Sequence, residues 1–125
     1  MSAIITIKKP IDITVARNFL RKRIAGTEWT PTCRARAAAV LTIYGEFILS
    51  LEATGQITVS ILKWQNPPLI ELKSTIQASG DHTAYIMEME DRLKRVTDES
   101  EVAMQGQCVV VSARIWTREG VVSNG

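Results

Sequence analysis

The sequence predicts an α/β (α+β) fold, a two-layer sandwich in which three helices cover one face of a mixed or antiparallel sheet. Alternating apolar and polar residues occur in paired runs joined by short turns, which is typical of hairpins. Three longer segments instead place apolar residues at helical spacing. Each kind of element has one apolar face, so a sheet and a helix layer can bury these faces against each other. The predicted order is β-α-α-β-β-α-β-β.

The size and composition indicate one globular domain. The chain has 125 residues, of which 46% are hydrophobic and 22% charged, and its net charge is +2. This charge is too small to indicate nucleic-acid binding without a clustered basic patch. The N-terminus has no long apolar segment of the kind found in signal peptides. We expect a cytoplasmic protein with one domain over residues 1–117 and a flexible tail over 118–125.

The N-terminal part predicts a strand followed by a helix. Residues 3–8 are apolar and β-branched, which favours a short strand. The helix is expected over residues 13–25, with Asp12 as its N-cap. Its expected core face consists of Val15, Phe19, Leu20 and Ile24. This arrangement leaves Arg17 and Arg21 pointing outward.

The second helix has the strongest start signal in the chain. Thr30 is a good N-cap, and Pro31 suits the first helical position. From Ala37 to Leu51 the only charged residue is Glu46. This run is shorter than the roughly 18 apolar residues of a membrane span, and it also contains Gly45. We therefore expect a core helix that lies against the sheet, and no membrane segment.

The rest of the chain predicts two hairpins separated by a third helix. The first hairpin covers residues 56–77 and the second covers residues 101–116, with Gly106 in its turn. The helix between them is expected to be capped by Asp81. Its expected apolar stripe consists of Tyr85, Ile86, Met89, Leu93 and Val96. Its outer face carries the i,i+4 pairs Glu88–Arg92, Glu90–Lys94 and Asp91–Arg95, which are typical of a solvated surface.

The sequence shows no metal-binding or nucleophilic constellation. Cys33 and Cys108 lack metal-type spacing, and we expect both to be reduced and buried, although a disulfide between them stays open. His82 is the single histidine, and we interpret it as a surface residue at a helix start. We therefore expect no metal site.

The order of elements resembles the ATPase domain of bacterial anti-sigma-factor serine kinases, which belong to the GHKL group of histidine-kinase-like ATPases. The best-matching stretch is "MEDRLKRVTDESEVAMQGQCVVVSARIW", which is similar to the last helix of that family, its D-x-x-E motif and its terminal hairpin. The basic first helix and the long apolar second helix are also similar. The resemblance implies a histidine-kinase-like ATPase fold and a role in signalling.

The nucleotide motifs of that family are incomplete here. Glu46 could match the general base of the N-box, but Ser50 stands where the family has its metal-binding Asn. The stretch "IQASGD" does not form a D-x-G-x-G motif, and no glycine occurs between Gly80 and Gly106 to form a phosphate loop. The resemblance therefore implies a degenerate member without a nucleotide cofactor and without catalytic residues. In the alternative, a divergent ATP-dependent protein serine kinase, Glu46 is the base.

The basic face of the first helix is the candidate binding surface. Arg17 and Arg21 lie one turn apart, and Lys22 and Arg23 widen the patch. The face is either solvated surface or a docking site for an acidic protein, and no interleaved aromatic residues indicate nucleic acid. The resemblance implies a sigma factor, an antagonist or another signalling protein as the partner. A structural subunit that oligomerises through its sheet, for example a homodimer, stays open.

Overall fold

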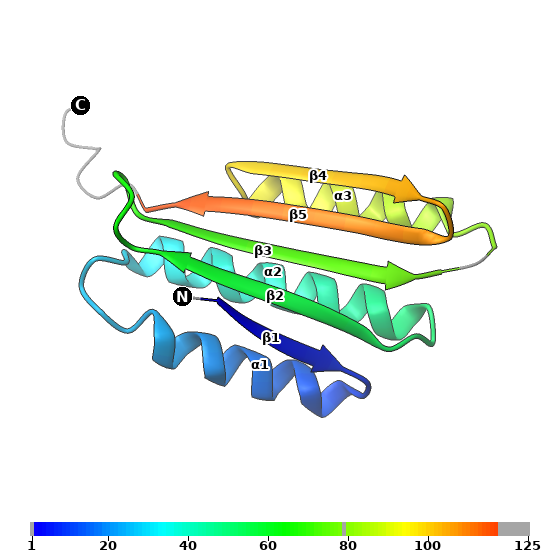
Figure 1. Ribbon diagram of the computed structural model, residues 1–125, viewed down its shortest axis with the longest axis horizontal. Helices are drawn as coiled ribbons and strands as arrows, with labels where there is room; N and C mark the ends of the chain where they lie inside the picture. The colour runs from blue at the N-terminus through cyan, green and yellow to red at the C-terminus, as the bar shows by residue number, and fades with distance from the viewer. Residues whose placement is uncertain (1, 79, 118–125) are drawn as a thin grey trace.

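The computed structural model describes residues 2–78 and 80–117, and it confirms the predicted fold class and element order. A five-stranded sheet in the order β1-β2-β3-β5-β4, in which all neighbours are antiparallel, is covered on one face by three helices (Figure 1). The elements are β1 (Ser2–Ile7), α1 (Pro10–Arg23), α2 (Pro31–Ser50), β2 (Gly55–Leu62), β3 (Leu69–Gln77), α3 (Thr83–Val96), β4 (Glu99–Gln105) and β5 (Cys108–Trp116). Among the described residues, no helix combines the length and apolar character that crossing a membrane requires.

Helix α2 is the central core helix, as predicted. Thr30 is its N-cap, and the Thr30 hydroxyl accepts a hydrogen bond of 3.1 Å from the backbone N–H of Cys33. Nine residues of α2 are buried against the sheet and the flanking helices. One of them, Tyr44, is fully buried, and its hydroxyl donates a hydrogen bond of 2.9 Å to the backbone carbonyl of Leu72 on β3. This bond ties α2 to the middle of the sheet.

Helix α1 begins three residues earlier than predicted, because Pro10 occupies its first turn. Asp12 is therefore inside the helix, at its third position, and the prediction that it is the N-cap was wrong. Its carboxylate accepts hydrogen bonds from the backbone N–H groups of Lys8 (2.8 Å) and Lys9 (3.0 Å). These bonds lower the pKa of Asp12. Asp12 therefore lies within the helix and binds the backbone N–H groups of the two residues that precede it.

The predicted core face of α1 was partly wrong. Val15 is 59% exposed and Phe19 is half-buried, whereas Ala16, Leu20 and Ile24 are buried. The small Ala16 is buried where the larger Val15 is not, which suits close packing of α1 against its neighbours. α1 and α2 also approach closely where Ile13 meets Gly45, since a Cβ atom at Gly45 would lie 2.5 Å from Cγ1 of Ile13.

Helix α3 begins at Thr83 with His82 at the N-cap position, one residue after the predicted cap. The Asp81 carboxylate still accepts hydrogen bonds from the Thr83 backbone N–H (3.0 Å) and from its hydroxyl (2.6 Å). Met89 and Leu93 are buried as predicted, but Tyr85 is 50% exposed and does not belong to the core stripe.

Both predicted hairpins are present, although β4 begins at Glu99, before the predicted residue 101. The apolar helix-facing residues of β3 and β5 are fully buried, among them Ile70, Leu72, Ile76, Val109, Val111, Ala113 and Ile115. Both cysteines are free thiols. Cys33 is buried, and this burial raises the pKa of the Cys33 thiol to about 11. Cys108 is half-buried, so the prediction that both are buried was wrong. The predicted tail over 118–125 lies outside the described residues.

Candidate functional site

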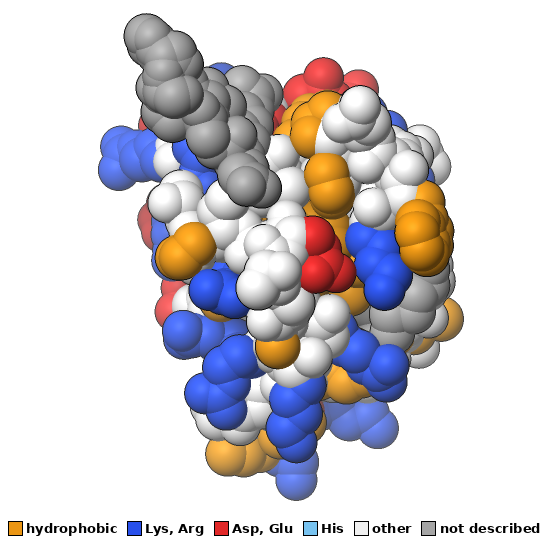
Figure 2. All heavy atoms as spheres, turned by 90° about the vertical axis from the view of Figure 1, so that its left-hand side faces the viewer, with side chains coloured by type: hydrophobic (Ala, Val, Ile, Leu, Met, Phe, Trp, Pro, Cys, Tyr) orange, Lys and Arg blue, Asp and Glu red, His pale blue; other side chains and the backbone are white. Residues whose placement is uncertain are grey.

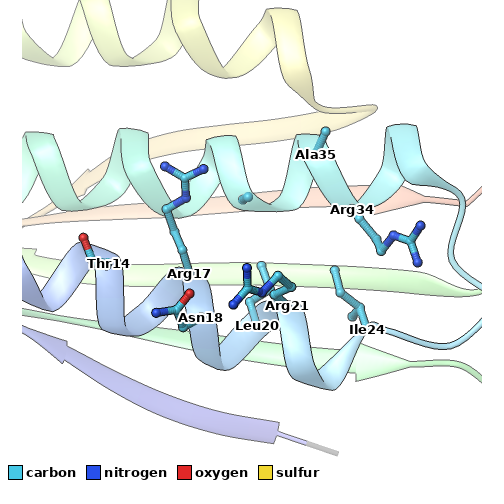
Figure 3. A pocket seen from close by; sticks show the side chains of 9 residues that line it. Thr14, Arg17, Asn18, Leu20, Arg21, Ile24, Arg34 and Ala35 are labelled. Carbon is cyan, nitrogen blue, oxygen red and sulfur yellow. The ribbon is translucent and has the colours of Figure 1, made fainter.

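A groove separates α1 from the N-terminal half of α2, and it contains both predicted partner-binding arginines. Its volume is about 400 Å³. The α1 side is lined by Thr14, Arg17, Asn18, Leu20, Arg21 and Ile24, and the α2 side by Arg34, Ala35 and Ala38 (Figure 3). Both arginines of α1 are exposed, as predicted. The groove places them beside a third arginine that sequence reasoning did not identify.

The shape of the groove follows from the residues that line it. Arg17 and Arg21 lie one turn apart along α1, so both project along the same side of the helix. Opposite them, Ala35 and Ala38 are among the smallest side chains that a helix can carry, which leaves space beside α2. Leu20 and Ile24 are buried and form part of the apolar floor of the groove. The result is a groove with an apolar floor and a cationic rim.

The three arginines of the groove lack acidic partners in the described part of the chain. Arg17, Arg21 and Arg34 form no salt bridge there, whereas Arg36, Arg92, Arg95 and Arg114 each pair with a carboxylate. An unpaired guanidinium keeps its five N–H donors available for an external carboxylate or phosphate. The groove is therefore suited to an anionic ligand group.

The surface around the groove is also basic. Seen from the end of the molecule, Lys and Arg side chains gather over the lower part of this face, on the side where α1 lies (Figure 2). The segment 2–23, which forms β1 and α1, contains six Lys and Arg residues and one Asp. An excess of one sign of charge attracts oppositely charged partners over a distance of about 8 Å at physiological salt.

A second hollow continues the surface from α1 across α2 to α3. Its volume is about 440 Å³, and Arg17 lines both hollows. The floor is formed by small and medium residues of α2, Ala35, Ala39, Thr42 and Ile43, and the far wall by Arg92, Arg95 and Val96 of α3. The helix layer thus has a continuous trough over α2 with arginines on both sides.

Glu46, the candidate base of the enzyme alternative, does not line this trough but pairs with Arg92, which does. Its carboxylate accepts a hydrogen bond of 2.8 Å from Arg92, and Ser50 donates one of 2.8 Å to the backbone carbonyl of Phe47. The two residues that match the N-box positions are therefore both engaged within the protein. The hollow beside them has a volume of about 160 Å³, below the roughly 300–1,000 Å³ typical of small-molecule sites.

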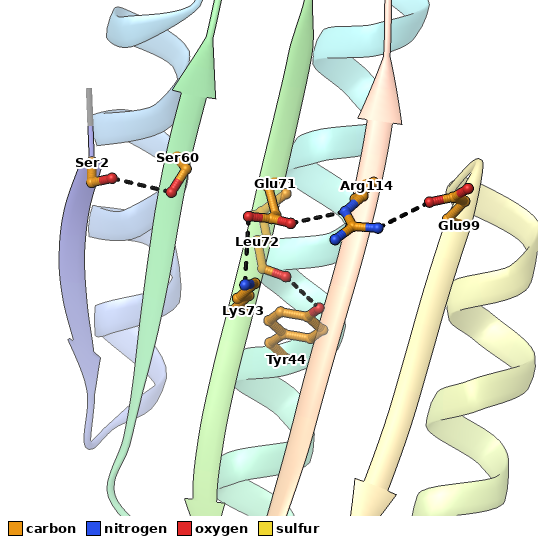
Figure 4. A network of polar contacts seen from close by, with 8 residues as sticks. All are labelled: Ser2, Tyr44, Ser60, Glu71, Leu72, Lys73, Glu99 and Arg114. Carbon is orange, nitrogen blue, oxygen red and sulfur yellow. Dashed lines mark hydrogen bonds and ion pairs between the residues drawn. The ribbon is translucent and has the colours of Figure 1, made fainter.

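The uncovered face of the sheet carries a polar network that sequence reasoning did not find. Arg114 on β5 donates hydrogen bonds to Glu71 on β3 (2.8 Å) and Glu99 on β4 (3.2 Å), and Lys73 lies 3.7 Å from Glu71 (Figure 4). The two carboxylates raise the pKa of Arg114, Glu71 contributing most. These charges neutralise one another, so the network offers less to an ionic ligand than the groove does.

Other candidate chemistry is sparse. Within residues 2–78 and 80–117, no group of three His, Cys, Asp or Glu residues is placed to hold a metal ion. His82 is half-buried at the start of α3. Arg34 could not be found from the sequence, because only the packing of α1 against α2 brings it beside Arg17 and Arg21.

The comparison with known proteins gives no family for this chain. No protein-family model matches the sequence, and a search of curated proteins finds no match.

Proposed function

We propose that this chain is a non-catalytic protein-binding module that docks an acidic partner in the groove between α1 and α2. The observation that carries the proposal is that Arg17, Arg21 and Arg34 all line one groove and form no salt bridge within the described chain. Three positive side chains along one groove attract an anionic partner that enters it. Arginine also binds carboxylates through two parallel hydrogen bonds, which adds geometric specificity.

The groove also favours a particular form of partner. Arg17 and Arg21 are four residues apart, so a partner helix with two carboxylates one turn apart can meet both guanidiniums. The apolar floor formed by Leu20, Ile24, Ala35 and Ala38 can accept an apolar side chain between those carboxylates. An acidic amphipathic helix therefore matches both the charge and the shape of the groove.

The resemblance to anti-sigma-factor serine kinases suggests the setting of this binding. In that setting the module acts in a bacterial partner-switching or signalling pathway without nucleotide, and its partner is a sigma factor, an antagonist or another signalling protein. The ion pair of Glu46 with Arg92 and the small hollow beside it support binding rather than catalysis. A divergent kinase would instead need Glu46 to be free to accept a proton from its substrate.

Affinity capture from the native host tests this proposal. The wild-type chain is compared with an Arg17→Glu/Arg21→Glu variant and with a Lys63→Glu/Lys94→Glu control, which makes the same change in net charge on other surfaces. We expect a partner with an acidic surface to be captured by the wild type and the control, and lost from the groove variant. A partner that binds all three chains equally contradicts the proposal.

A further inference from the structure

Among the described residues, the sheet ends in two edge strands, β1 and β4, each of which pairs with another strand on one side only. Edge strands are usually protected from pairing by charged residues or proline. β1 contains neither, and its Ile4 side chain is 65% exposed. β4 contains Glu99 and Glu101, which repel a second β4 edge, and its Met104 side chain is 54% exposed. Both edges therefore present backbone hydrogen-bonding groups together with exposed apolar surface.

A helix lies next to each of these edge strands, α1 near β1 and α3 near β4 (Figure 1). On α1, Val15 and Phe19 lie one turn apart on the side that faces away from the groove, and Val15 is 59% exposed. On α3, Met87 is 63% exposed and is not among the residues that line the hollows toward α2. Each edge thus consists of an edge strand, with one side open for pairing, and a neighbouring helix with exposed apolar side chains.

The two edges carry opposite charge. The segment 2–23, at the β1 edge, has one Asp and, apart from the two arginines of the groove, four basic residues, Lys8, Lys9, Lys22 and Arg23. The segment 81–105, at the β4 edge, has seven Asp and Glu residues and three Lys and Arg residues. Two β1 edges repel each other, as do two β4 edges, whereas a β1 edge attracts a β4 edge.

The strand directions allow the unlike edges to meet. Four successive antiparallel pairings make β1 and β4 run in the same direction (Figure 1). A second copy placed beside the first, with its helices on the same side, therefore sets its β1 parallel to β4 and its α1 beside α3. The strands are of similar length, six and seven residues, so most of the ladder can form.

We infer that copies of this chain associate head to tail, with the β1–α1 edge of one copy on the β4–α3 edge of the next. Such an interface uses two different surfaces, so it produces an open chain or a closed ring rather than a twofold dimer. Arg17 and Arg21 face α2 and not the edge. The groove therefore stays open in the assembly, and this inference stands independently of the proposed function.

Sedimentation velocity over a concentration series tests the inference first. The monomer mass is 13.9 kDa. At low salt we expect the average mass to rise past that of a dimer, either continuously or up to a closed ring, and to fall as salt screens the opposite charges. A chain that stays monomeric at millimolar concentration, or that stops at a dimer, overturns the inference.

Edge variants identify the two surfaces. Ile4→Glu/Val15→Glu places acidic groups on the β1 edge, and Met87→Lys/Met104→Lys places basic groups on the β4 edge. We expect each variant alone to be monomeric and their mixture to associate, because each retains the edge that the other has lost. In a symmetric β1–β1 dimer the β4-edge variant would still dimerise alone, and the mixture would add nothing, which overturns the inference. The controls Trp64→Glu, in the turn between β2 and β3, and Tyr85→Lys, on the side of α3 that faces α2, alter exposed aromatic residues outside the proposed contact and should associate like the wild type.

Discussion

Arg92 on α3 lies 2.8 Å from the carboxylate of Glu46 on α2, and the resulting ion pair joins the two helices at the protein surface. Glu46 is the one charged residue between Ala37 and Leu51. The pair explains how this otherwise uncharged stretch of α2 contains a carboxylate, since the side chain reaches solvent and a guanidinium instead of the core. Both side chains are partly exposed, 52% for Glu46 and 37% for Arg92.

Breaking this ion pair should have a small effect on stability. We expect Glu46→Gln to lower the free energy of unfolding by about 0–1 kcal/mol, because exposed ion pairs are weakened by solvent and salt. A double-mutant cycle with Arg92→Gln, measured by urea unfolding, gives the coupling between the two side chains. A coupling well above about 1 kcal/mol would show that the pair is more than a surface contact.

The contact of Gly45 with Ile13 should make α1 packing sensitive to a single methyl group. Alanine favours a helix by about 0.5–1 kcal/mol over glycine, but a Cβ atom at Gly45 would lie 2.5 Å from Cγ1 of Ile13. We expect Gly45→Ala to destabilise the protein by about 1–3 kcal/mol, as overpacking does. The combined change with Ile13→Ala should cost less than the sum of the two single changes. Stabilisation by Gly45→Ala alone would show that α1 moves aside freely.

The hydrogen bond from Tyr44 to the Leu72 carbonyl predicts a pH-dependent stability difference. Tyr44→Phe should lower the free energy of unfolding at neutral pH by about 0.5–1.5 kcal/mol, the usual net value of such a bond. Burial, and to a lesser extent the charge of Glu71, raises the pKa of Tyr44 well above its ordinary value of 10.0. Above pH 10 the tyrosine ionises in the unfolded chain and not in the folded one, so its contribution is lost as pH rises. The stability difference between wild type and Tyr44→Phe should therefore shrink above pH 10. A difference that grows in that range contradicts the burial of the hydroxyl.

Mg-ATP and Mg-ADP should leave the melting temperature unchanged at millimolar concentration. A ligand present at about 100 times its dissociation constant stabilises a protein by about 2.7 kcal/mol. In a domain of this size such a gain raises the melting temperature by about 10 °C, which thermal unfolding detects readily. A clear shift, abolished by Glu46→Gln, would favour the kinase alternative over the binding module.

The elements with strong local signals could be predicted from the sequence. Thr30 and Pro31 give the start of α2, and strict alternation gives the buried faces of β2, β3 and β5. The face of α1 could not be predicted as well, because hydrophobicity favours Val15 whereas the close approach of the helices favours the smaller Ala16.

The candidate site was only partly accessible to sequence reasoning. The spacing of Arg17 and Arg21 indicates a shared helix face, but Arg34 joins them only through the packing of α2 against α1. Likewise, helical spacing predicts that Arg92 pairs with Glu88, whereas the neighbouring helix supplies Glu46 instead. Of the three predicted i,i+4 pairs, Asp91–Arg95 is the one that forms a salt bridge among the described residues.

The association rate of the chain with its captured partner, measured at two ionic strengths, tests the role of the arginine groove most directly. The comparison uses wild type, Arg17→Glu/Arg21→Glu and the Lys63→Glu/Lys94→Glu control. Because surface substitutions usually change stability by less than about 0.5 kcal/mol, all three chains should fold. We predict that the wild type binds fastest at low salt, and that the groove variant binds more slowly there and gains from added salt, because its charge then repels the partner. Equal association rates for wild type and groove variant at low salt would contradict the account.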